Sequence, residues 1–187
     1  MRPRILALMT YLWLWGGTVA NAQSNYTAFE LIRENNWDPL ILEDLNGDGA
    51  KDIVYSSFDP AFGRELHIHY QQDDGGFSAN PRRIEIKTEI IAISFADLRD
   101  DPGKELVLFA DSGIFSLSTA IEGYAENLKL LTAWDLIATI PDRQRVHFNN
   151  IPTEIDGDGL VDLLVAGDDQ YGLFLGNKDE TFTLKTR

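Results

Sequence analysis

Short apolar runs separated by turn-forming residues recur along the chain from residue 37 onward. Two of these runs, residues 66–70 and 84–87, alternate apolar and polar side chains with the two-residue period of a half-buried β-strand. Glycine, proline, aspartate and asparagine gather between the runs, as turns require. Residues 127–136 are ambiguous between the strand and the helical period, and no long amphipathic helical pattern occurs elsewhere. The pattern predicts an all-β fold of about twelve strands.

The predicted strands form three groups of four, and each group carries an acidic loop between its first and second strand. The loops begin at Asp44, Asp97 and Glu154, which are 53 and 57 residues apart. This period is too long for a solenoid coil of one strand and a turn, and it fits a four-stranded propeller blade. The repeats cover approximately residues 37–88, 89–141 and 142–187. The strands are expected within residues 39–42, 53–55, 66–70, 83–86, 90–95, 106–109, 114–117, 128–140, 146–151, 163–165, 171–175 and 182–184.

We therefore expect a β-propeller-like array of three four-stranded blades, a partial propeller with a loop site between the first and second strands of its blades. Closed propellers usually have four to eight blades, and closure protects their strand edges. Three blades would leave open edges and an apolar blade face, which invite association. Two copies related by a two-fold axis would give six blades, so we expect a homodimer. The alternative is a monomer capped by its own strand from residues 26–32.

The first 22 residues have the pattern of an export signal. Arg2 and Arg4 give a positive start, residues 5–15 are almost wholly apolar, and Ala20-Asn21-Ala22 places small residues where a signal peptidase reads them. The apolar run is shorter than the roughly 20 residues that a membrane span needs, although a short anchor or a buried N-terminal helix is the alternative. We expect cleavage after Ala22, a secreted or periplasmic protein without a membrane span, and one repeat domain over residues 23–187.

Composition narrows the possible partners. The chain has 187 residues, no cysteine and a formal net charge of −14. The lack of cysteine excludes disulfides, cysteine-based zinc sites and a thiol nucleophile. The acidic charge argues against nucleic acid as a partner and against attraction to anionic lipid, because both require basic surfaces. An exported chain without disulfides needs another source of stability, and an acidic surface suits cations.

The first and third acidic loops have the composition of a calcium site. When Asp44 is counted as position one, side chains with oxygen stand at positions one, three, five and nine, and the position-seven carbonyl adds a neutral oxygen. Gly47 and Gly49 permit the tight backbone that such a loop needs. Calcium prefers six to eight oxygen ligands, whereas zinc prefers histidine or cysteine. An ordinary acidic hairpin turn is the alternative. The expected ligands are Asp44, Asn46, Asp48, Ala50 and Asp52 in the first loop, and Glu154, Asp156, Asp158, Leu160 and Asp162 in the third.

The second loop departs from this plan. Asp97 and Glu105 remain at positions one and nine, but Arg99 takes position three and Pro102 takes the place of a glycine. Arginine is always protonated and brings a fixed positive charge to the place of the ion. We expect this loop to be free of metal, with Arg99 pairing with Asp97, Asp101 or Glu105 instead.

The loop pattern Asp-x-Asn/Asp-x-Asp-Gly-x-x-Asp, followed by an apolar strand, resembles the FG-GAP/VCBS repeat. The segment 172–177 with Thr181-Phe182, and the segment 74–77, are similar to the usual ending of bacterial copies. That family includes the calcium-loop blades of integrin α-subunit propellers and many exported bacterial proteins. The resemblance implies a β-propeller fold, structural calcium and roles in adhesion or recognition. It covers nearly all of the chain after residue 22, with the second loop and the count of only three repeats as departures.

Catalytic motifs are absent from the sequence. It contains no Gly-x-Ser-x-Gly elbow, His-Glu-x-x-His motif, phosphate loop or dinucleotide fingerprint. His67 and His69 share a strand face and could bind zinc or do acid–base chemistry with an acidic neighbour. No third ligand is assignable, so we expect both to face solvent, and we expect the same of His147. Five aromatic residues could stack on sugars or a partner, although a core role is favoured: Trp37, Tyr70, Tyr124, Trp134 and Tyr171.

The sequence therefore predicts a non-catalytic, exported calcium-binding module that binds a protein or a glycan. A carbohydrate-active enzyme, either a polysaccharide lyase or a hydrolase built on calcium-binding blades, is the alternative, because many carboxylates could act in pairs. An enzyme would need a cluster of acid–base residues that are not metal ligands. A binding module would not need such a cluster. A structural module whose partner is its own copy is a third possibility.

Overall fold

The chain folds into β-strands only, within the part that the structure describes. The structure is a computed structural model that describes residues 28–31, 39–137 and 143–186, and these ranges contain thirteen strands and no helix. The predicted all-β class is confirmed. The expected signal peptide and its cleavage site lie outside the described residues. Residues 28–31, which belong to the expected capping strand, are not in a strand.

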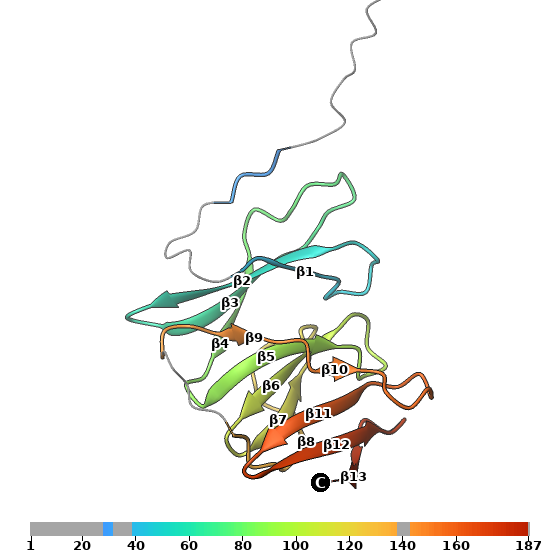
Figure 1. Cartoon of the computed structure of the whole chain (residues 1–187). Helices are drawn as coiled ribbons and strands as arrows, with labels where there is room; N and C mark the ends of the chain where they lie inside the picture. Colours follow the sequence, from blue (N-terminus) through green and yellow to red (C-terminus); the bar gives the residue numbers. More distant parts are fainter. Residues whose placement is uncertain (1–27, 32–38, 138–142, 187) are drawn as a thin grey trace, which may run out of the picture.

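The strands form three sheets, and none of the sheets closes on itself (Figure 1). The first sheet has the order β1-β2-β3-β4, and every neighbouring pair in it is antiparallel. Its strands are β1 (Ile41–Glu43), β2 (Asp52–Asp59), β3 (Gly63–His69) and β4 (Arg82–Ile86). All four overlap the predicted strands of the first repeat, with bounds that differ by up to four residues.

The second sheet follows the same up-and-down order and gains one additional strand. Its strands are β5 (Ile90–Ala96), β6 (Glu105–Ala110), β7 (Gly113–Leu117), β8 (Leu128–Thr132) and β9 (His147–Phe148). The ambiguous segment near residue 128 is therefore a strand, because β8 pairs with the apolar strand β7. β9 comes from the third repeat and pairs in parallel with β5. The sequence did not predict this exchange between repeats.

The third sheet repeats the order of the first. Its strands are β10 (Pro152–Thr153), β11 (Asp162–Gly167), β12 (Gln170–Gly176) and β13 (Phe182–Thr186). The predicted run at residues 146–151 is split, because its first part becomes β9 in the second sheet and the third sheet begins only at Pro152. Each sheet therefore takes its four antiparallel strands from one repeat, in chain order.

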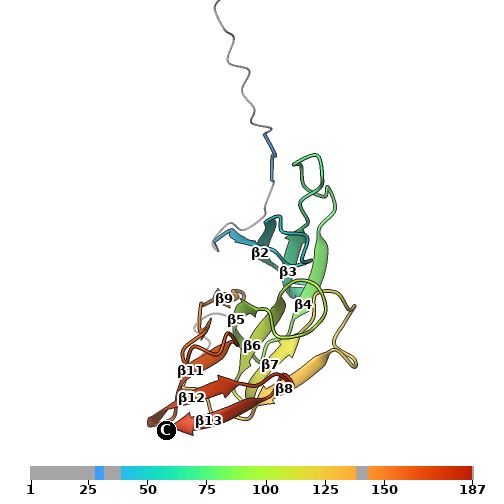
Figure 2. The same ribbon diagram turned by 90° about the vertical axis from the view of Figure 1, so that its right-hand side faces the viewer.

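The second sheet lies between the first and the third, as the two perpendicular views show (Figures 1 and 2). Its strand β6 is buried at all six positions. Leu106 and Leu108 pack into a core with the first sheet, whereas Val107 and Phe109 pack into a core with the third sheet. Alternate side chains of a strand point to opposite faces. Stacking on both sides thus explains why β6 is continuously apolar from Leu106 to Ala110 rather than alternating.

A buried arginine ties the first sheet to its neighbours. Arg64 on β3 is only 2% exposed. Its guanidinium donates hydrogen bonds to the carbonyl oxygens of Lys87, of Ile90 at 3.0 Å and of Arg145 at 3.0 Å. Lys87 and Ile90 flank the connection to the second sheet, and Arg145 begins the segment that leads into β9. Charge-assisted hydrogen bonds offset the cost of burying this cation, so Arg64 fixes the packing of the first sheet.

The two outer faces of the stack differ in character. On the first sheet, Tyr55, His67 and His69 face away from the core and are nevertheless buried, at 7%, 8% and 4% exposure. The expectation that both histidines face solvent is therefore wrong, because they stack on the Tyr55 ring. On the third sheet, Leu164 and Tyr171 are 54% and 67% exposed. No helix in the described part of the chain has the length and apolar character that crossing a membrane requires.

Candidate metal-binding loops

The three acidic loops occupy equivalent places in the three sheets. Each one joins the first antiparallel strand to the second: residues 44–51 join β1 to β2, residues 97–104 join β5 to β6, and residues 154–161 join β10 to β11. The side chains of the first and third loops are mostly exposed, whereas position nine is buried in all three. Equivalent placement allows the loops to be compared position by position.

Position nine anchors each loop through the same hydrogen bond. Asp52, Glu105 and Asp162 are 0%, 1% and 0% exposed. Their carboxylates accept a hydrogen bond from the backbone amide of position two at 2.9, 2.8 and 2.7 Å respectively, donated by Leu45, Leu98 and Ile155. A buried carboxylate needs such partners. Position nine therefore closes the loop whether or not the loop carries the other ligand side chains.

In the first and third loops the same carboxylate also ties down a second segment. The other oxygen of Asp52 accepts a hydrogen bond from the amide of Gln71 at 2.9 Å. The other oxygen of Asp162 accepts one from the amide of Gly176 at 2.9 Å. Gly176 is the last residue of β12, and Gln71 lies two residues after the end of β3, so both donors are near the end of the third strand of their sheet. Burial is the largest effect on the pKa of Asp52 and raises it.

The first loop is wound around its own acidic side chains. The two carboxylate oxygens of Asp44 accept hydrogen bonds from the amides of Gly47 at 2.7 Å and Gly49 at 2.9 Å. Both glycines have positive φ, at 76° and 85°, as predicted for a tight loop. Asp48 accepts from the amide of Ala50 at 2.7 Å and from the side chain of Asn46 at 2.8 Å. The expected ligand side chains thus lie on one turn of chain.

The third loop repeats this winding and brings its carboxylates closer together. Glu154 accepts from the amide of Gly157, and Asp158 accepts from the amide of Leu160 at 2.8 Å. Oxygen atoms of Glu154, Asp156 and Asp162 all lie within 4.8 Å of one another. Asp158 is outside this group of three. The longer Glu at position one therefore still reaches the other carboxylates.

The donor set of the third loop fits calcium. All three converging side chains offer carboxylate oxygen, which is the ligand that calcium prefers. Each carboxylate oxygen has two lone pairs, so accepting one amide leaves a second pair for an ion. The first loop offers the carboxylates of Asp44, Asp48 and Asp52, which also accept hydrogen bonds from amides. Asn46 adds an amide oxygen. The arrangement can hold a hard dication and offers no nitrogen or sulfur ligand.

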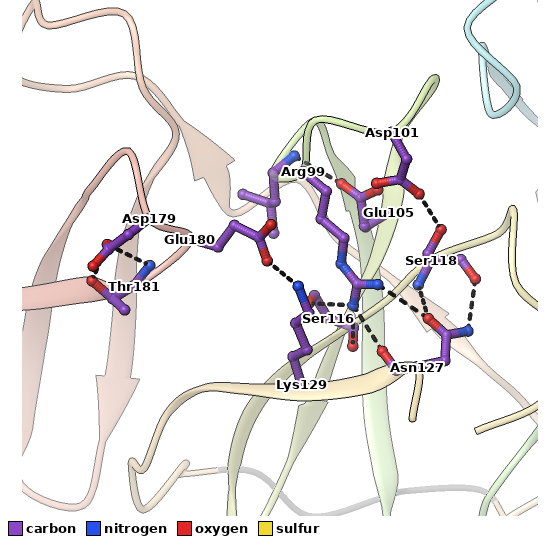
Figure 3. Close-up of polar contacts among 11 residues, drawn as sticks. Arg99, Asp101, Glu105, Ser116, Ser118, Asn127, Lys129, Asp179, Glu180 and Thr181 are labelled. Carbon is purple, nitrogen blue, oxygen red and sulfur yellow. Dashed lines mark hydrogen bonds and ion pairs between the residues drawn. The ribbon is translucent and has the colours of Figure 1, made fainter. Parts of the chain in front are cut away.

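The second loop is organised by Arg99. Figure 3 shows its guanidinium next to Ser116 and Asn127, to which it donates hydrogen bonds of 2.8 Å (Asn127 O), 3.0 Å (Ser116 Oγ) and 3.1 Å (Asn127 Oδ1). Ser116 lies on β7, and Asn127 precedes β8. The expected pairing of Arg99 with an acidic side chain of its own loop is therefore wrong. Arg99 instead joins the loop to two neighbouring strands, because buried carbonyl groups there require donors.

The acidic residues of the second loop find other partners. Asp101 accepts a hydrogen bond from the Ser118 hydroxyl at 2.5 Å. Burial raises the pKa of Glu105 to about 7, against opposing effects of the Leu98 amide and the Arg99 charge. A carboxyl with a raised pKa carries less negative charge at neutral pH than an ordinary one, so it attracts a cation less strongly. These contacts close the loop through its own hydrogen bonds, and the absence of metal from it stays a prediction.

Sequence reasoning placed the loops correctly but missed the anchoring role of position nine. It treated Asp52 and Asp162 only as ligands, and Glu105 only as a possible partner of Arg99. The sequence contained a sign of this role, because the second loop keeps an acid at position nine although the rest of its ligand set is lost.

Among the aromatics expected in the core, Trp134 is buried at 8% exposure, whereas Tyr171 is exposed. Trp37 lies outside the described residues.

Comparisons of the chain with protein-family profiles, with curated proteins and with solved structures found no match.

Proposed function

We propose that the chain is an exported, calcium-binding, β-propeller-like repeat module of the FG-GAP/VCBS type, which binds a protein or a glycan and has no catalytic role. The observation that carries the proposal is the third loop, where oxygens of Glu154, Asp156 and Asp162 lie within 4.8 Å of one another. Like charges at this spacing repel one another, and a dication converts the repulsion into attraction. The loop therefore gains stability when calcium is present.

The repeated architecture supports the same function. Three loops share one place in three stacked sheets, each with four antiparallel strands from one repeat, and two of the loops keep the full set of oxygen-bearing positions. Calcium at these loops would fix the turn between the first and second strand of a blade. This gives a chain without cysteine a source of stability outside the cell, where calcium is abundant. The ion has a structural role in this proposal, and the outer surfaces of the sheets are free to bind the protein or glycan partner.

The experiment is a thermal and urea unfolding series with calcium and with a chelator. Exported calcium modules bind at about 0.1–1 mM. Millimolar calcium should therefore raise the free energy of unfolding by about 1.4 kcal/mol per site at the tighter end of that range. Asp48→Asn and Asp158→Asn should each remove part of this gain. Asp111→Asn changes an exposed aspartate in the turn between β6 and β7 and serves as the matched control.

The number of bound ions gives a second readout. Native mass spectrometry should count at most two calcium ions per chain, because Arg99 occupies the second loop. A transition that is identical with calcium and with chelator would contradict the calcium proposal. The partner is sought separately, by screening the calcium-loaded protein against a glycan array and a protein array. Hydrolysis or elimination on any polysaccharide that it binds would contradict the non-catalytic role.

A further inference from the structure

A pocket lies where the first strands of the three sheets meet. It has a volume of about 440 Å³, and Ile41 of β1, Phe95 of β5 and Pro152 of β10 all line it. Ligand pockets in proteins commonly have volumes of about 300–1,000 Å³. Asp97 of the second acidic loop and Val161 of the third also line the pocket, whereas the expected calcium ligands do not. All three repeats therefore contribute to one cavity that the calcium proposal does not use.

Two phenylalanine side chains give the pocket an apolar wall. Phe95 lies on β5, and Phe148 lies on the parallel strand β9 beside it. Their rings are 14° from parallel, with 6.1 Å between the centroids, and both side chains are only partly buried. Aromatic rings attract a cation that lies over their faces, and the planar guanidinium of arginine also stacks on such rings. This wall therefore suits a flat, cationic group.

The charged side chains of the pocket leave one carboxylate unpaired. Glu43 accepts a hydrogen bond from Lys104 Nζ at 2.7 Å and lies 3.7 Å from Lys51 Nζ, so its charge is compensated. The exposed side chain of Asp97 has neither a hydrogen bond nor an ion pair with any residue that the structure describes. Phe95 and Asp97 are two residues apart in an extended segment, so their side chains point to the same side. A cation over the Phe95 ring is therefore close to a free carboxylate.

Asn149 adds an acceptor that lacks a donor. Its backbone is held on β5, because its amide donates to Ile93 O at 3.0 Å and its oxygen accepts from the Ser94 hydroxyl at 2.7 Å. Its side-chain oxygen Oδ1 is buried without a hydrogen-bond partner, and Asn149 lines the pocket next to Phe148. A buried acceptor without a donor is costly. The terminal torsion of asparagine is broad, so a small rotation turns Oδ1 toward an N–H group in the pocket.

We propose that this pocket receives an arginine side chain from a basic segment of a partner protein. The guanidinium lies over the Phe95 ring and donates hydrogen bonds to the carboxylate of Asp97, with Asn149 Oδ1 as the acceptor for a remaining N–H group. Arginine offers five N–H donors in a planar fork, whereas lysine offers a compact ammonium group. The net charge of −14 attracts such a segment. The inference rests on the proposed function, of which it selects the protein partner over the glycan.

The experiment is a titration with N-acetyl-arginine amide in millimolar calcium, followed through the backbone amides by nuclear magnetic resonance, which detects weak binding. We expect the resonances of Asp97, Phe148 and Asn149 to shift. Asp97→Asn should weaken binding by about tenfold, because hydrogen bonds between two charged groups are lost. Asp111→Asn removes an equal charge in the exposed turn between β6 and β7 and should bind as the unchanged protein does. N-acetyl-citrulline amide has a similar shape without the charge and should bind much more weakly.

Several results would overturn the proposal. Equal binding of the citrulline compound would show that the charge is not recognised. Equal weakening by Asp97→Asn and Asp111→Asn would indicate only a general attraction to an acidic protein. Shifts confined to the amides of Gly47 and Gly157 would place the compound on the acidic loops. A neutral oligosaccharide that shifts the Phe148 resonance, where the arginine compound does not, would make the pocket a glycan site.

Failure of the calcium proposal is recognised separately, because the titration is repeated in chelator and does not depend on the unfolding series. An unfolding transition without any calcium effect, together with arginine-dependent shifts at Asp97 and Asn149, would leave the arginine pocket and remove the calcium role. A protein that calcium stabilises but whose pocket resonances do not respond to the arginine compound would give the reverse result.

Discussion

Gly47 in the first loop and Gly103 in the second lie so close together that a Cβ atom added to Gly47 would stand 2.6 Å from the backbone nitrogen of Gly103. A Cβ atom added to Gly103 would stand 2.3 Å from the backbone oxygen of Leu45. The same oxygen accepts a hydrogen bond from the Thr119 hydroxyl at 2.8 Å. The loop that has lost its ligands therefore braces the neighbouring loop that has kept them.

Replacing Gly47 by alanine should destabilise the protein more than the same change at Gly49. Both positions have positive φ, 76° and 85°, where alanine costs about 1–2 kcal/mol. Only Gly47 faces the backbone of the second loop, whereas nothing lies within 4 Å of a Cβ at Gly49. Urea unfolding should show a further loss of about 1–3 kcal/mol for Gly47→Ala. Equal losses at the two positions would mean that the loops do not brace each other.

Removal of the Arg99 side chain should destabilise the protein even when no calcium is present. Arg99→Ala would leave Ser116 and Asn127, at 1% and 0% exposure, without their charged donor. Losing such hydrogen bonds costs about 1.5–3 kcal/mol. Arg99→Lys should recover only part of this, because an ammonium group cannot reproduce the planar fork. The measurement is chemical unfolding in chelator, and full stability of the alanine variant would contradict the role of Arg99.

Stability should fall as Glu105 ionises. Its pKa is raised to about 7 in the folded protein, from an ordinary value of 4.5. Between these values the folded state binds the proton more tightly than the unfolded state, so the free energy of unfolding decreases as pH rises. Glu105→Gln keeps an acceptor for the Leu98 amide and removes the charge. It should reduce this decrease by up to about 3 kcal/mol.

The pH dependence is measured by urea unfolding from acid to mildly alkaline pH. Glu122→Gln, at an exposed position in a loop, is the control and should follow the unchanged protein. A Glu105→Gln profile that runs parallel to that of the unchanged protein would exclude Glu105 as the cause. The opposite behaviour is expected from His67, whose pKa burial lowers, because stability is then lost as pH falls below its ordinary value of 6.5.

We expect the protein to be a homodimer that uses the outer face of the third sheet. Leu164 and Tyr171 are 54% and 67% exposed there, and an open blade face invites association. Leu164→Lys should shift the molar mass measured by light scattering from two chains to one. Leu130→Lys alters a leucine of similar exposure, 57%, on β8 and should leave the mass unchanged. A single-chain mass for the unchanged protein would contradict the homodimer.

Local patterns predicted the strands well because the physical causes are local. Alternation along β3 and β4 and the turn residues between them depend on neighbours in sequence. The segment near Asn127 was ambiguous because it forms a strand through pairing with β7, and this pairing is set by the tertiary structure rather than by local sequence. β9 could not be foreseen for the same reason, since two residues carry little pattern and their partner β5 lies in another repeat.

The loops were recognisable because ligand spacing is also a property of local sequence. The sequence could not reveal which loop side chains form hydrogen bonds with distant segments of the chain. Arg99 satisfies groups that lie 17 and 28 residues away, so its direction depends on how the second sheet folds. The burial of His67 and His69 likewise follows from Tyr55 and from Phe29, which approaches from the N-terminal side. Alternation indicates that a strand has two faces, but it does not indicate what covers the outer one.

The parallel strand β9 makes the repeat an unsuitable unit for dissection. The segment that begins the third repeat first meets the first sheet, where Arg64 binds the oxygen of Arg145, and then joins the second sheet. Asn149 continues this contact through its amide, which donates to the oxygen of Ile93 at 3.0 Å. A truncation at residue 141 would therefore remove the third sheet and also strip a strand from the second. Fragments cut at the repeat boundaries are therefore not independent units. A fragment that contains the second sheet would need residues 143–149 in addition to the second repeat, because β9 belongs to that sheet.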